Sequence, residues 1–514
     1  MNNLGFVMEL GLKDKVPGIY LTTLFGVGDA TDSDLEKVLL LVGGIDPTTA
    51  TLAQDSDVVP VLSTADADRA GPGSELARMA YGALKIPGIK VRMASASISS
   101  AVPATATITV NGTPTTSGAW SYRIGGVAIR NTITVSDTPT TIANAIAKAV
   151  NVPQMMVSAA VTSGVGGAKI VTLTHKTPGA RGNDCIVWQD TSGLATGITS
   201  AIAGGSAVGN GGKRFHNGVG VEDFTTLLGN LLEDRYYRIA VSANDSVSLA
   251  AWRDQLDTKA GPLVGKMEHA VFAFSGTLSA GTSLAQTSLN EERAQLCWME
   301  DAETATAEIA AKMAAIRIKA EQDDPNQSYD GLELSGVAPQ TDKATNPNRA
   351  TQVAALDVGL TPIVTRTNKT GSKAVVLRAI TSRSLTASGG VDDGTLDVAD
   401  SAVVDEVRDV VRTYWETTFS KAYKYVDDDP TGASPVTQPS GTATPKVWTS
   451  ECMNLLHRLE RLGWLTKVAS NPVTSTLNKQ ASSPRIAFFA PTVRRQHQHQ
   501  MEGTLGQMRF SAAA

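Results

Sequence analysis

The sequence predicts a multidomain α/β protein with an inserted β-rich domain and an α+β domain near its C-terminal end. A continuous apolar run from Lys37 to Gly44 is typical of a strand that an α/β sheet buries on both faces. Near Ser95 the composition shifts to a stretch that is rich in Thr, Ala, Gly and Ser and poor in charge. Two long helical patterns, at 402–424 and 446–465, follow further along the chain.

Length and composition describe an ordinary folded protein. The chain has 514 residues, which exceeds what one hydrophobic core serves, so we expect roughly three or four domains. Its formal net charge of −5 argues against a polyanion-binding protein, and we expect no direct contact with nucleic acid.

Cysteine usage and the first residues indicate a protein made in a cytoplasm. Cys185, Cys297 and Cys452 are far apart and form no Cys-x-x-Cys pair, which fits a reducing compartment better than a disulfide framework. Met1–Leu4 lacks the basic region and the long apolar core of a signal peptide. No run approaches the ~20 apolar residues of a membrane span, so we expect a soluble protein without membrane insertion.

We assign residues 26–98 and 213–385 to one discontinuous α/β domain. Its first part combines the buried strand with a helix that starts at Ser74 and a strand at Ile89–Met93, which together begin a strand–helix–strand unit. After the insert the alternation returns, and we expect strands at 237–241, 270–274, 294–299 and 375–380 and helices at 222–232, 246–258 and 304–321. We predict a polar loop at Asp323–Asn348.

Residues 99–212 are predicted to form the inserted β-rich domain. Thr105–Val110 alternates as a half-buried strand should, and Asn111-Gly112 behind it is a dipeptide typical of hairpin turns. We expect further strands at 119–124, 127–135 and 169–174, one helix at Thr138–Asn151, and a glycine-rich return linker at 203–212.

Residues 386–493 are predicted to form the α+β C-terminal domain. An acidic loop rich in Pro, Gly and Ser, Asp427–Pro445, separates its two long helices. A compact apolar run at Ile486–Val493 follows the second helix and is predicted to be a strand.

Strand arms are predicted at both ends, at residues 1–25 and 494–514. Alternate positions of an extended chain carry apolar or small residues on one face: Leu4, Phe6, Met8, Leu10, Leu12, Thr504, Gly506, Met508 and Phe510. Strands with an apolar face and no sequential partner must pair in their own domain or at the sheet edge of a neighbour. We interpret these residues as candidates for strand exchange between subunits of a polymerising structural protein.

One catalytic motif needs consideration. Gly281–Ala285 resembles the serine motif of subtilisin-type proteases, but no His-Gly-Thr, Asp-Thr-Gly or Asp-Ser-Gly segment precedes Ser283. The nearest upstream histidine, His269, lies at the start of a predicted strand. We therefore predict that the protein is not an enzyme and has no catalytic residues.

Candidate metal and phosphate sites are weak. His497 and His499 would share one face of a strand, but apart from Glu502 no nearby residue completes a ligand set, so a solvated linker is favoured. The glycine-rich stretches 164–167 and 209–213 lack the spacing of a phosphate-binding loop. We expect no metal and no cofactor.

A basic row lies on or just after the second long helix. Arg458, Arg461 and Lys467 form this row. The buried side of the helix is predicted to carry Leu455, Leu456, Leu459 and Leu462. The ordinary interpretation is a solvated face, and the functional one is a surface that docks an acidic partner.

In order along the chain, these segments resemble the contractile tail sheath proteins of bacteriophages, particularly the Mu-like sheaths. Gly71–Met79 matches the family's Gly-x-Gly-Ser-x-Leu-x-x-Met segment. The other segments that carry the resemblance are Val16–Tyr20, Lys37–Gly44, Ala104–Asn111, Ile124–Gly126, Thr138–Asn151, Leu173–Lys176, Gly182–Asp184, Arg378–Ser382, Thr444–Lys446 and Leu462–Leu465. The loops 323–348 and 427–444 depart from the family pattern.

The resemblance implies an α/β domain of subtilisin-like topology without protease activity. It also implies hexameric rings that stack as a helix around a tail tube, with arms that join strands of neighbouring C-terminal domains. The subunit would be assembled in the host bacterial cytoplasm, reside in the virion tail, and contact the tube, baseplate and tail terminator proteins. Contraction would drive the tube through the host envelope for genome delivery, and Arg458, Arg461 and Lys467 become candidates for facing the tube.

Three alternatives remain at this point. The first is the sheath of a related contractile machine, such as a tailocin or a secretion system. The second, which the missing triad disfavours, is a serine hydrolase that uses Ser283. The third, a surface adhesin or decoration protein, explains the β-rich insert but neither the α/β domain nor the terminal strands.

Overall fold

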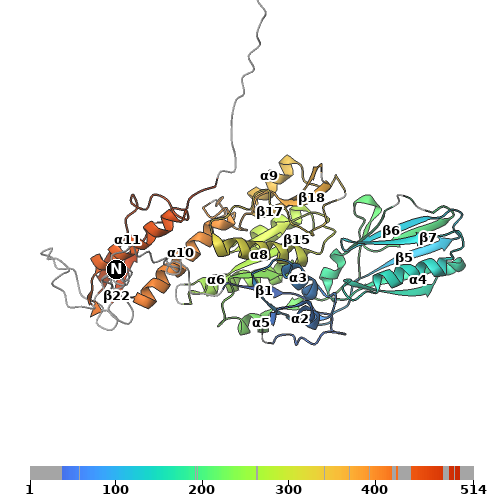
Figure 1. Cartoon of the computed structure of the whole chain (residues 1–514), viewed down its shortest axis with the longest axis horizontal. Helices are drawn as coiled ribbons and strands as arrows, with labels where there is room; N and C mark the ends of the chain where they lie inside the picture. The colour runs from blue at the N-terminus through green and yellow to red at the C-terminus, as the bar shows by residue number, and fades with distance from the viewer. Residues whose placement is uncertain are drawn as a thin grey trace, which may run out of the picture. The chain divides into compact units, whose positions relative to one another are not determined.

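The computed structural model describes residues 37–497 except 57, 191–192, 194, 262–263, 341, 370, 393, 419–423, 426–441, 479–484 and 491. The described chain falls into two compact units, which centre on residues 37–403 and 404–495 (Figure 1). The predicted mixed α/β class with several sheets is confirmed. None of the described helices combines the length and the apolarity that a membrane crossing requires.

An eight-stranded sheet in the order β18-β17-β16-β15-β14-β1-β3-β2 forms the centre of the first unit. The six inner strands run parallel, and β2 and β18 pair antiparallel at the two edges. The strands are β1 (Val38–Val42), β2 (Val59–Val61), β3 (Lys90–Ala94), β14 (Arg238–Val241), β15 (His269–Phe274), β16 (Ala294–Trp298), β17 (Leu360–Asn368) and β18 (Gly371–Val376).

Helices cover both faces of this sheet, and β1 contributes to both cores. Its residues Leu39 and Leu41 pack with α3 (Glu75–Ala83) and α8 (Thr306–Asp323), whose many alanines let it approach the sheet closely. Its residue Leu40 packs on the other face. The helices of that face are α5 (Thr225–Asn230), α6 (Ser246–Ala260) and the π-helical η5 (Leu284–Leu289). Smaller helices are α2 (Thr64–Ala67), η1 (Asp68–Ala70), α7 (Leu278–Ser283) and α9 (Arg349–Asp357).

Most of the elements predicted for this region are confirmed, and the misses have local reasons. The helix predicted at 222–232 begins only at Thr225, because Glu222–Asp223 forms strand β13 with β4 (Ser97–Ile98). β17 and α9 were not predicted. The loop predicted at 323–348 is confirmed, since the described residues between α8 and α9 form no helix or strand. It buries Tyr329 and Leu334 against the sheet and so covers part of the core.

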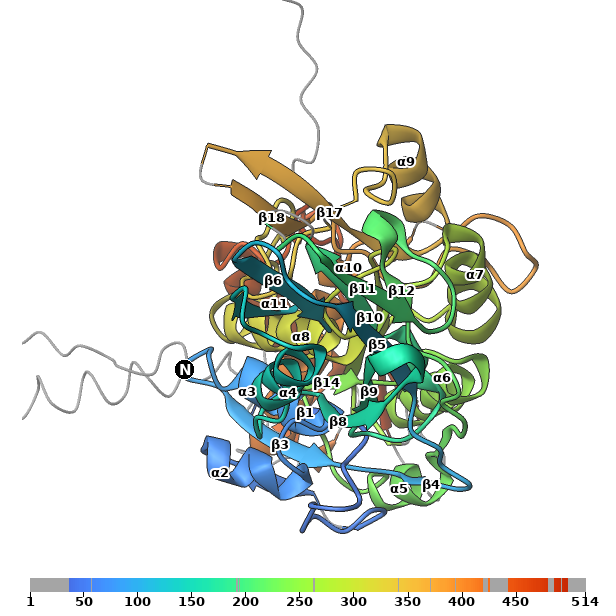
Figure 2. The ribbon, with the colours of Figure 1, turned by 90° about the vertical axis from the view of Figure 1, so that its right-hand side faces the viewer.

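The inserted domain is a sandwich of two four-stranded antiparallel sheets with one helix (Figure 2). One sheet has the order β12-β10-β6-β7 and the other has the order β11-β5-β9-β8. The strands are β5 (Thr105–Gly112), β6 (Gly118–Ile124), β7 (Val127–Ile133), β8 (Val157–Ser163), β9 (Lys169–His175), β10 (Ile186–Asp190), β11 (Ile198–Ala203) and β12 (Lys213–Arg214). Short helices are η2 (Val165–Gly167), η3 (Ala180–Asp184) and η4 (Gly209–Gly211).

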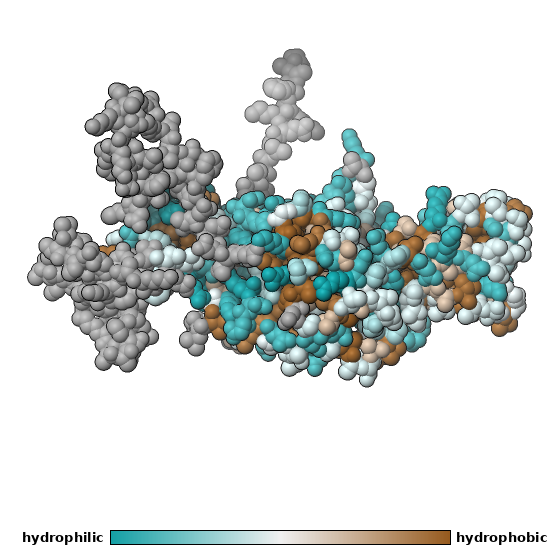
Figure 3. Space-filling model, turned by 60° about the horizontal axis from the view of Figure 1, so that its bottom comes forward, coloured by the Kyte–Doolittle hydropathy of each residue, from teal (hydrophilic) through white to brown (hydrophobic). Residues whose placement is uncertain are grey.

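The helix of the insert, α4 (Pro139–Val150), matches the predicted range. Thr138 caps its N-terminus and Pro139 occupies its first position, both of which favour a helix start. Its face with Ile142 and Ile146 joins the core between the two sheets. Much of the surface of the insert is pale in Figure 3, since Thr, Ser, Ala and Gly have intermediate hydropathy.

The hairpin predicted at Asn111-Gly112 is wrong. Both residues continue β5, where they pair with Thr199 and Ile198 of β11, and β6 belongs to the other sheet. Gly112 has a φ of +92°, and a Cβ there would lie 2.5 Å from the carbonyl oxygen of Gly197. The glycine therefore permits a close approach between two strands rather than a two-residue turn.

The second unit contains most of helix α10 (Val398–Thr418), from Val404 onward, and helix α11 (Pro445–Arg461). Strands β21 (Thr474–Asn478) and β22 (Arg485–Phe489) form an antiparallel pair, and the short strands β19 (Lys424–Tyr425) and β20 (Thr442–Ala443) form a parallel one. The buried side of α11 carries Leu455, Leu456 and Leu459, as predicted, but Leu462, which was predicted with them, follows the last helical residue and is 52% exposed. The arm residues Leu4 to Leu12 and Thr504 to Phe510 lie outside the described residues, as does most of 427–445.

Candidate functional site

The strand order places a topological switch point between β1 and β14. After β1 the next parallel strand, β3, lies on one side, whereas the following strand, β14, lies on the other. In open α/β sheets, ligands bind in the crevice at the carboxyl ends of such strands. Here the inserted domain leaves the sheet after the carboxyl end of β3 and returns before α5, so it lies over the edge where an enzyme would hold its ligand.

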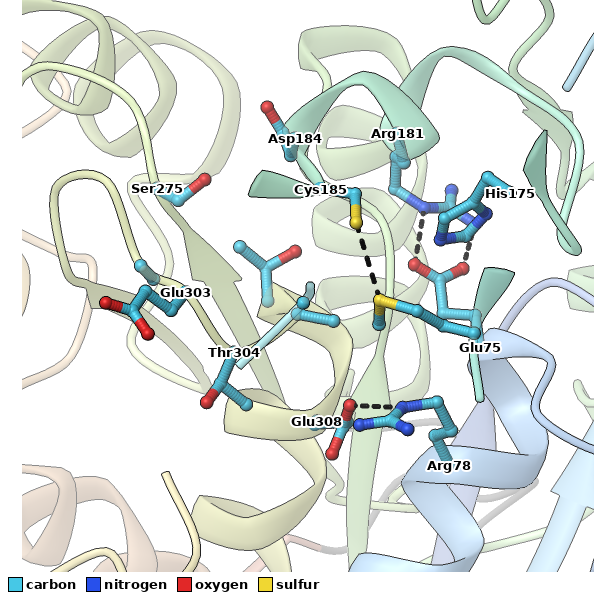
Figure 4. Close-up of a pocket in the computed structure, with 15 residues that line it drawn as sticks. Glu75, Arg78, His175, Arg181, Asp184, Cys185, Ser275, Glu303, Thr304 and Glu308 are labelled. Carbon is cyan, nitrogen blue, oxygen red and sulfur yellow. Dashed lines mark hydrogen bonds and ion pairs between the residues drawn. The ribbon is translucent and has the colours of Figure 1, made fainter. Parts of the chain in front are cut away.

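An arginine of the insert occupies this edge. Arg181, from η3, contacts Glu75 at the start of α3, with 2.6 Å between Nη2 and Oε2 (Figure 4). The same guanidinium pairs with both carboxylate oxygens of Glu222 on β13. The side chains of Arg181, Glu75 and Glu222 are exposed by only 11, 8 and 4%. The cluster therefore joins the insert, a helix of the body and the returning strand out of contact with bulk water.

Electrostatics keep this arginine charged. Burial alone would lower the pKa of Arg181, but the carboxylates of Glu222 and Glu75 outweigh it and raise the pKa above its ordinary value. Nearby, burial lowers the pKa of His175 and favours its neutral form. Its Nδ1 lies 2.7 Å from the carbonyl oxygen of Thr177, to which it donates in the matching tautomer. His175 is therefore a buried neutral side chain that packs at the site and bonds a backbone carbonyl.

Further ion pairs surround the cluster. Arg78 Nε lies 2.6 Å from Glu308 Oε1 and thereby links α3 to α8. Arg214 bridges Asp184 at 3.1 Å and Asp301 at 2.6 Å. Burial raises the pKa of Cys185 to about 12, so its thiol is not a ready nucleophile.

The arrangement is suited to holding the insert and the body together. Its carboxylates Glu75, Glu222 and Glu308 are each paired with an arginine, and its histidine bonds a backbone carbonyl. In the part of the chain that the structure describes, no group of three or more His, Cys, Asp and Glu side chains could hold a metal ion. Sequence reasoning missed this cluster. Gly71–Met79, Leu173–Lys176 and Gly182–Asp184 were singled out as matching segments, but Arg181 and Glu222 were not, and the partners are distant in sequence.

The candidate nucleophile Ser283 is not organised for catalysis. It is exposed on the last turn of α7, and its Oγ donates to the carbonyl oxygen of Ser279 at 3.3 Å, a bond typical of a serine in a helix. His269 is buried in β15 within the central sheet. The two residues therefore belong to different layers of the body.

The candidate tube-facing residues lie at one end of α11. Arg458 is half-buried and Arg461 is exposed in the last turn, where cations interact favourably with the helix dipole. Lys467 is exposed beyond the helix with a φ of +57°. Their role in binding a tube stays a prediction. Of the two histidines weighed as metal ligands, His497 lies with Nε2 2.7 Å from the carbonyl oxygen of Asn326, and His499 lies outside the described residues.

Comparison with known proteins gives matches among solved structures alone. No family model and no curated protein matches the chain. A sheath tail protein from Desulfitobacterium hafniense shares 13% identity and a TM-score of 0.45, with 93% of this chain and 100% of that chain covered. The helical sheath of the anti-feeding prophage in its contracted state shares 11% identity and a TM-score of 0.39, with 96% and 99% covered. The flagellar cap protein domains D2–D3 from Escherichia coli share 15% identity and a TM-score of 0.13, with 24% of this chain and 77% of that chain covered. The first two of these structures are sheath proteins, and each alignment covers more than nine tenths of both chains.

Proposed function

We propose that this chain is the subunit of a contractile tail sheath, a structural protein and not an enzyme. The observation that carries the proposal is the switch-point edge, where buried ion pairs fasten a domain in the place of a ligand. This arrangement occurs in a chain whose motifs, in order, resemble those of Mu-like sheaths. The proposal includes a subtilisin-like topology for the α/β domain and the division into arms, α/β domain, insert and C-terminal domain.

The edges of the sheets support assembly through the C-terminal domain. In the eight-stranded sheet, β2 carries Pro60, which has no amide hydrogen to offer a further strand. The other edge, β18, is covered by the chain at 331–334, as in the bond from Val376 N to the carbonyl oxygen of Leu332 at 2.8 Å. Among the described strands, β21 and β22 pair only with each other. We propose that an arm of a neighbouring subunit pairs at an outer edge of β21–β22.

The mechanism follows from such contacts. A donor strand at one place and an acceptor edge at another make heterologous contacts, which propagate as open helical arrays. We propose stacked hexameric rings around a tail tube, with the C-terminal domain and its row of Arg458, Arg461 and Lys467 facing the tube. Residues 13–15 and 494–500 would serve as hinges while rigid bodies repack.

The extended array would be a kinetically trapped state held by the tube, baseplate and terminator proteins. Its contraction would drive the tube through the host envelope to deliver the genome. The subunit would belong to a virion tail that is assembled in the host cytoplasm. The sheath of a related contractile machine would use the same assembly, and genomic context separates the two.

Electron microscopy of the purified full-length chain tests the proposal. We expect long hollow tubes with a regular axial striation. Deletion of residues 1–12 or of 497–514 is expected to leave a folded monomer that forms no tubes. Normal tubes from either truncated chain would contradict strand exchange, and a chain that stays monomeric even with its tube protein added would contradict the sheath proposal.

A further inference from the structure

The inserted domain is connected to the α/β body by a paired ribbon rather than by two free linkers. Val102 and Val219 exchange both backbone hydrogen bonds, at 2.9 and 3.1 Å, and Thr105 and His216 do the same at 2.8 and 3.0 Å. Nearer the body, β4 pairs with β13. A ribbon that is hydrogen-bonded at three levels resists bending far more than two separate single strands do.

A second contact lies where the loop before α3 meets the insert. Lys176 Nζ donates to the carbonyl oxygens of Pro72 at 2.9 Å and Pro153 at 2.7 Å, and so links the two domains. Gly73 has a φ of +82°, and a Cβ on it would lie 2.1 Å from the carbonyl oxygen of Met155. This close backbone contact requires glycine at position 73.

Further contacts lie beyond other strands of the sheet. Arg214 of β12 reaches the carbonyl oxygen of Ser275 after β15, at 3.0 Å, and Asp301 after β16, at 2.6 Å. Arg123 of β6 pairs with Glu303 at 3.1 Å. Together with the cluster of Arg181, these anchors are spread over the carboxyl ends of several strands. Because they hold the insert at more than two separate places, they oppose rotation as well as bending.

We infer that the inserted domain and the α/β body form one rigid body, and that Gly73, Lys176 and Arg181 are the positioning residues that set the orientation of the insert. Separating the domains would break these charge-assisted hydrogen bonds, which are stronger than hydrogen bonds between neutral groups. Any displacement of the body is therefore transmitted to the outer end of the insert. The inference also gives Gly71–Met79, the best-matching sequence motif, a physical role. It holds whether or not the chain is a sheath subunit.

Distance measurements between spin labels test the inference. One label is placed at Leu62→Cys on the body and the other at Val165→Cys on the insert, because these residues are 83 and 96% exposed. The native cysteines are buried and stay unlabelled. Dilution with unlabelled chain removes distances between subunits. We expect a narrow distance distribution in the full-length chain. A broad distribution in this chain would by itself overturn the inference.

The contacts that Gly73, Lys176 and Arg181 make between the insert and the body are called the joint below. Variants of the joint add a second test. Lys176→Met combined with Arg181→Met is expected to broaden the distribution about twofold and to speed amide exchange at Val102 and Val219 about tenfold, since local opening becomes cheaper. Arg130→Met, which removes an exposed arginine of the insert, is the matched control and should change neither measurement. If the joint variants keep the native fold and both measurements stay unchanged, these residues do not position the insert. If they fail to fold, the distribution of the parent chain decides.

Discussion

Two buried clusters in the first unit combine arginine and glutamate side chains in opposite proportions: one has a carboxylate between two guanidinium groups, and the other has a guanidinium group between two carboxylates. In the core of the α/β body, the carboxylate of Glu321 lies between Arg238 of β14 and Arg317 of its own helix, with 3.0 Å between Arg317 Nε and Glu321 Oε1. At the joint, the guanidinium of Arg181 lies between the carboxylates of Glu75 and Glu222. One cluster joins elements within a domain, and the other joins two domains.

The difference in burial decides what each cluster does. The side chains of Glu321, Arg238 and Arg317 are at most 2% exposed, and Tyr329 donates a hydrogen bond to Glu321 Oε1 at 3.0 Å. Burial alone would raise the pKa of Glu321, but Arg238 and Arg317 outweigh it and hold the pKa below its ordinary value. The joint is exposed by up to 11% and lies at the sheet edge, where water enters once the domains part. The core cluster therefore supports the whole fold, whereas the joint supports one orientation.

The largest predicted effect is that of Glu321→Ala. It leaves two arginines buried without their carboxylate, and we expect the free energy of unfolding to fall by about 3–5 kcal/mol. Urea denaturation of the first unit measures this. Glu233→Ala, which removes a 90% exposed partner of Lys266, is the control and should change stability by less than about 0.5 kcal/mol. Equal losses of unfolding free energy in the two variants would show that burial does not determine how much these ion pairs contribute to stability.

Glu222→Gln should have a smaller and more local effect. It removes one of the two charges that flank Arg181, and we expect a loss of about 1.5–3 kcal/mol. The loss should appear as faster amide exchange in η3 and in the paired ribbon that connects the insert to the body, while the central strands keep their protection. Glu333→Gln on the exposed pair with Lys373 is the control. If the amides of β14 and β15 lost as much protection from exchange as those of η3, the effect would not be local, and the proposed difference between core and joint would be wrong.

Sequence reasoning succeeded where local patterns determine structure. The run Lys37–Gly44 forms a strand with all five residues of β1 buried, because continuous apolar residues suit a strand covered on both faces. The helix predicted at Thr138–Asn151 has both caps at the predicted ends. Such elements depend on neighbours within a few positions, which a single sequence displays.

The joint could not be predicted, because its partners are remote in sequence. Arg181 lies 106 positions from Glu75 and 41 from Glu222, and nothing in the local pattern of any of the three marks a buried charge. Glu222 was even assigned to a helix. Gly73 was recognised as part of a motif, but its requirement comes from the carbonyl oxygen of Met155, which only the fold brings near. Tertiary contacts decided all three cases.

A third buried carboxylate, that of Glu291, has its pKa shifted in the opposite direction from the pKa of Glu321. Glu291 precedes β16, and its nearest arginine contact is long, with 3.7 Å between Arg293 Nη1 and Glu291 Oε1. Lacking the flanking arginines of Glu321, it has its pKa raised by burial to about 7. A raised pKa favours the folded state while the group is protonated, and this stability is lost as the pH rises through about 7.

We therefore expect Glu291→Gln to stabilise the protein by about 1–2 kcal/mol at pH 8 and by little at pH 5. Glutamine stays neutral and keeps an oxygen that can accept the amide hydrogen of Arg293, as Oε1 does at 3.2 Å. Urea denaturation at the two pH values measures the difference, and Glu233→Gln is the control that should show none. If Glu291→Gln destabilises the protein at pH 8, then the single arginine suffices to hold the buried charge. Flanking arginines would then not be what separates Glu321 from Glu291.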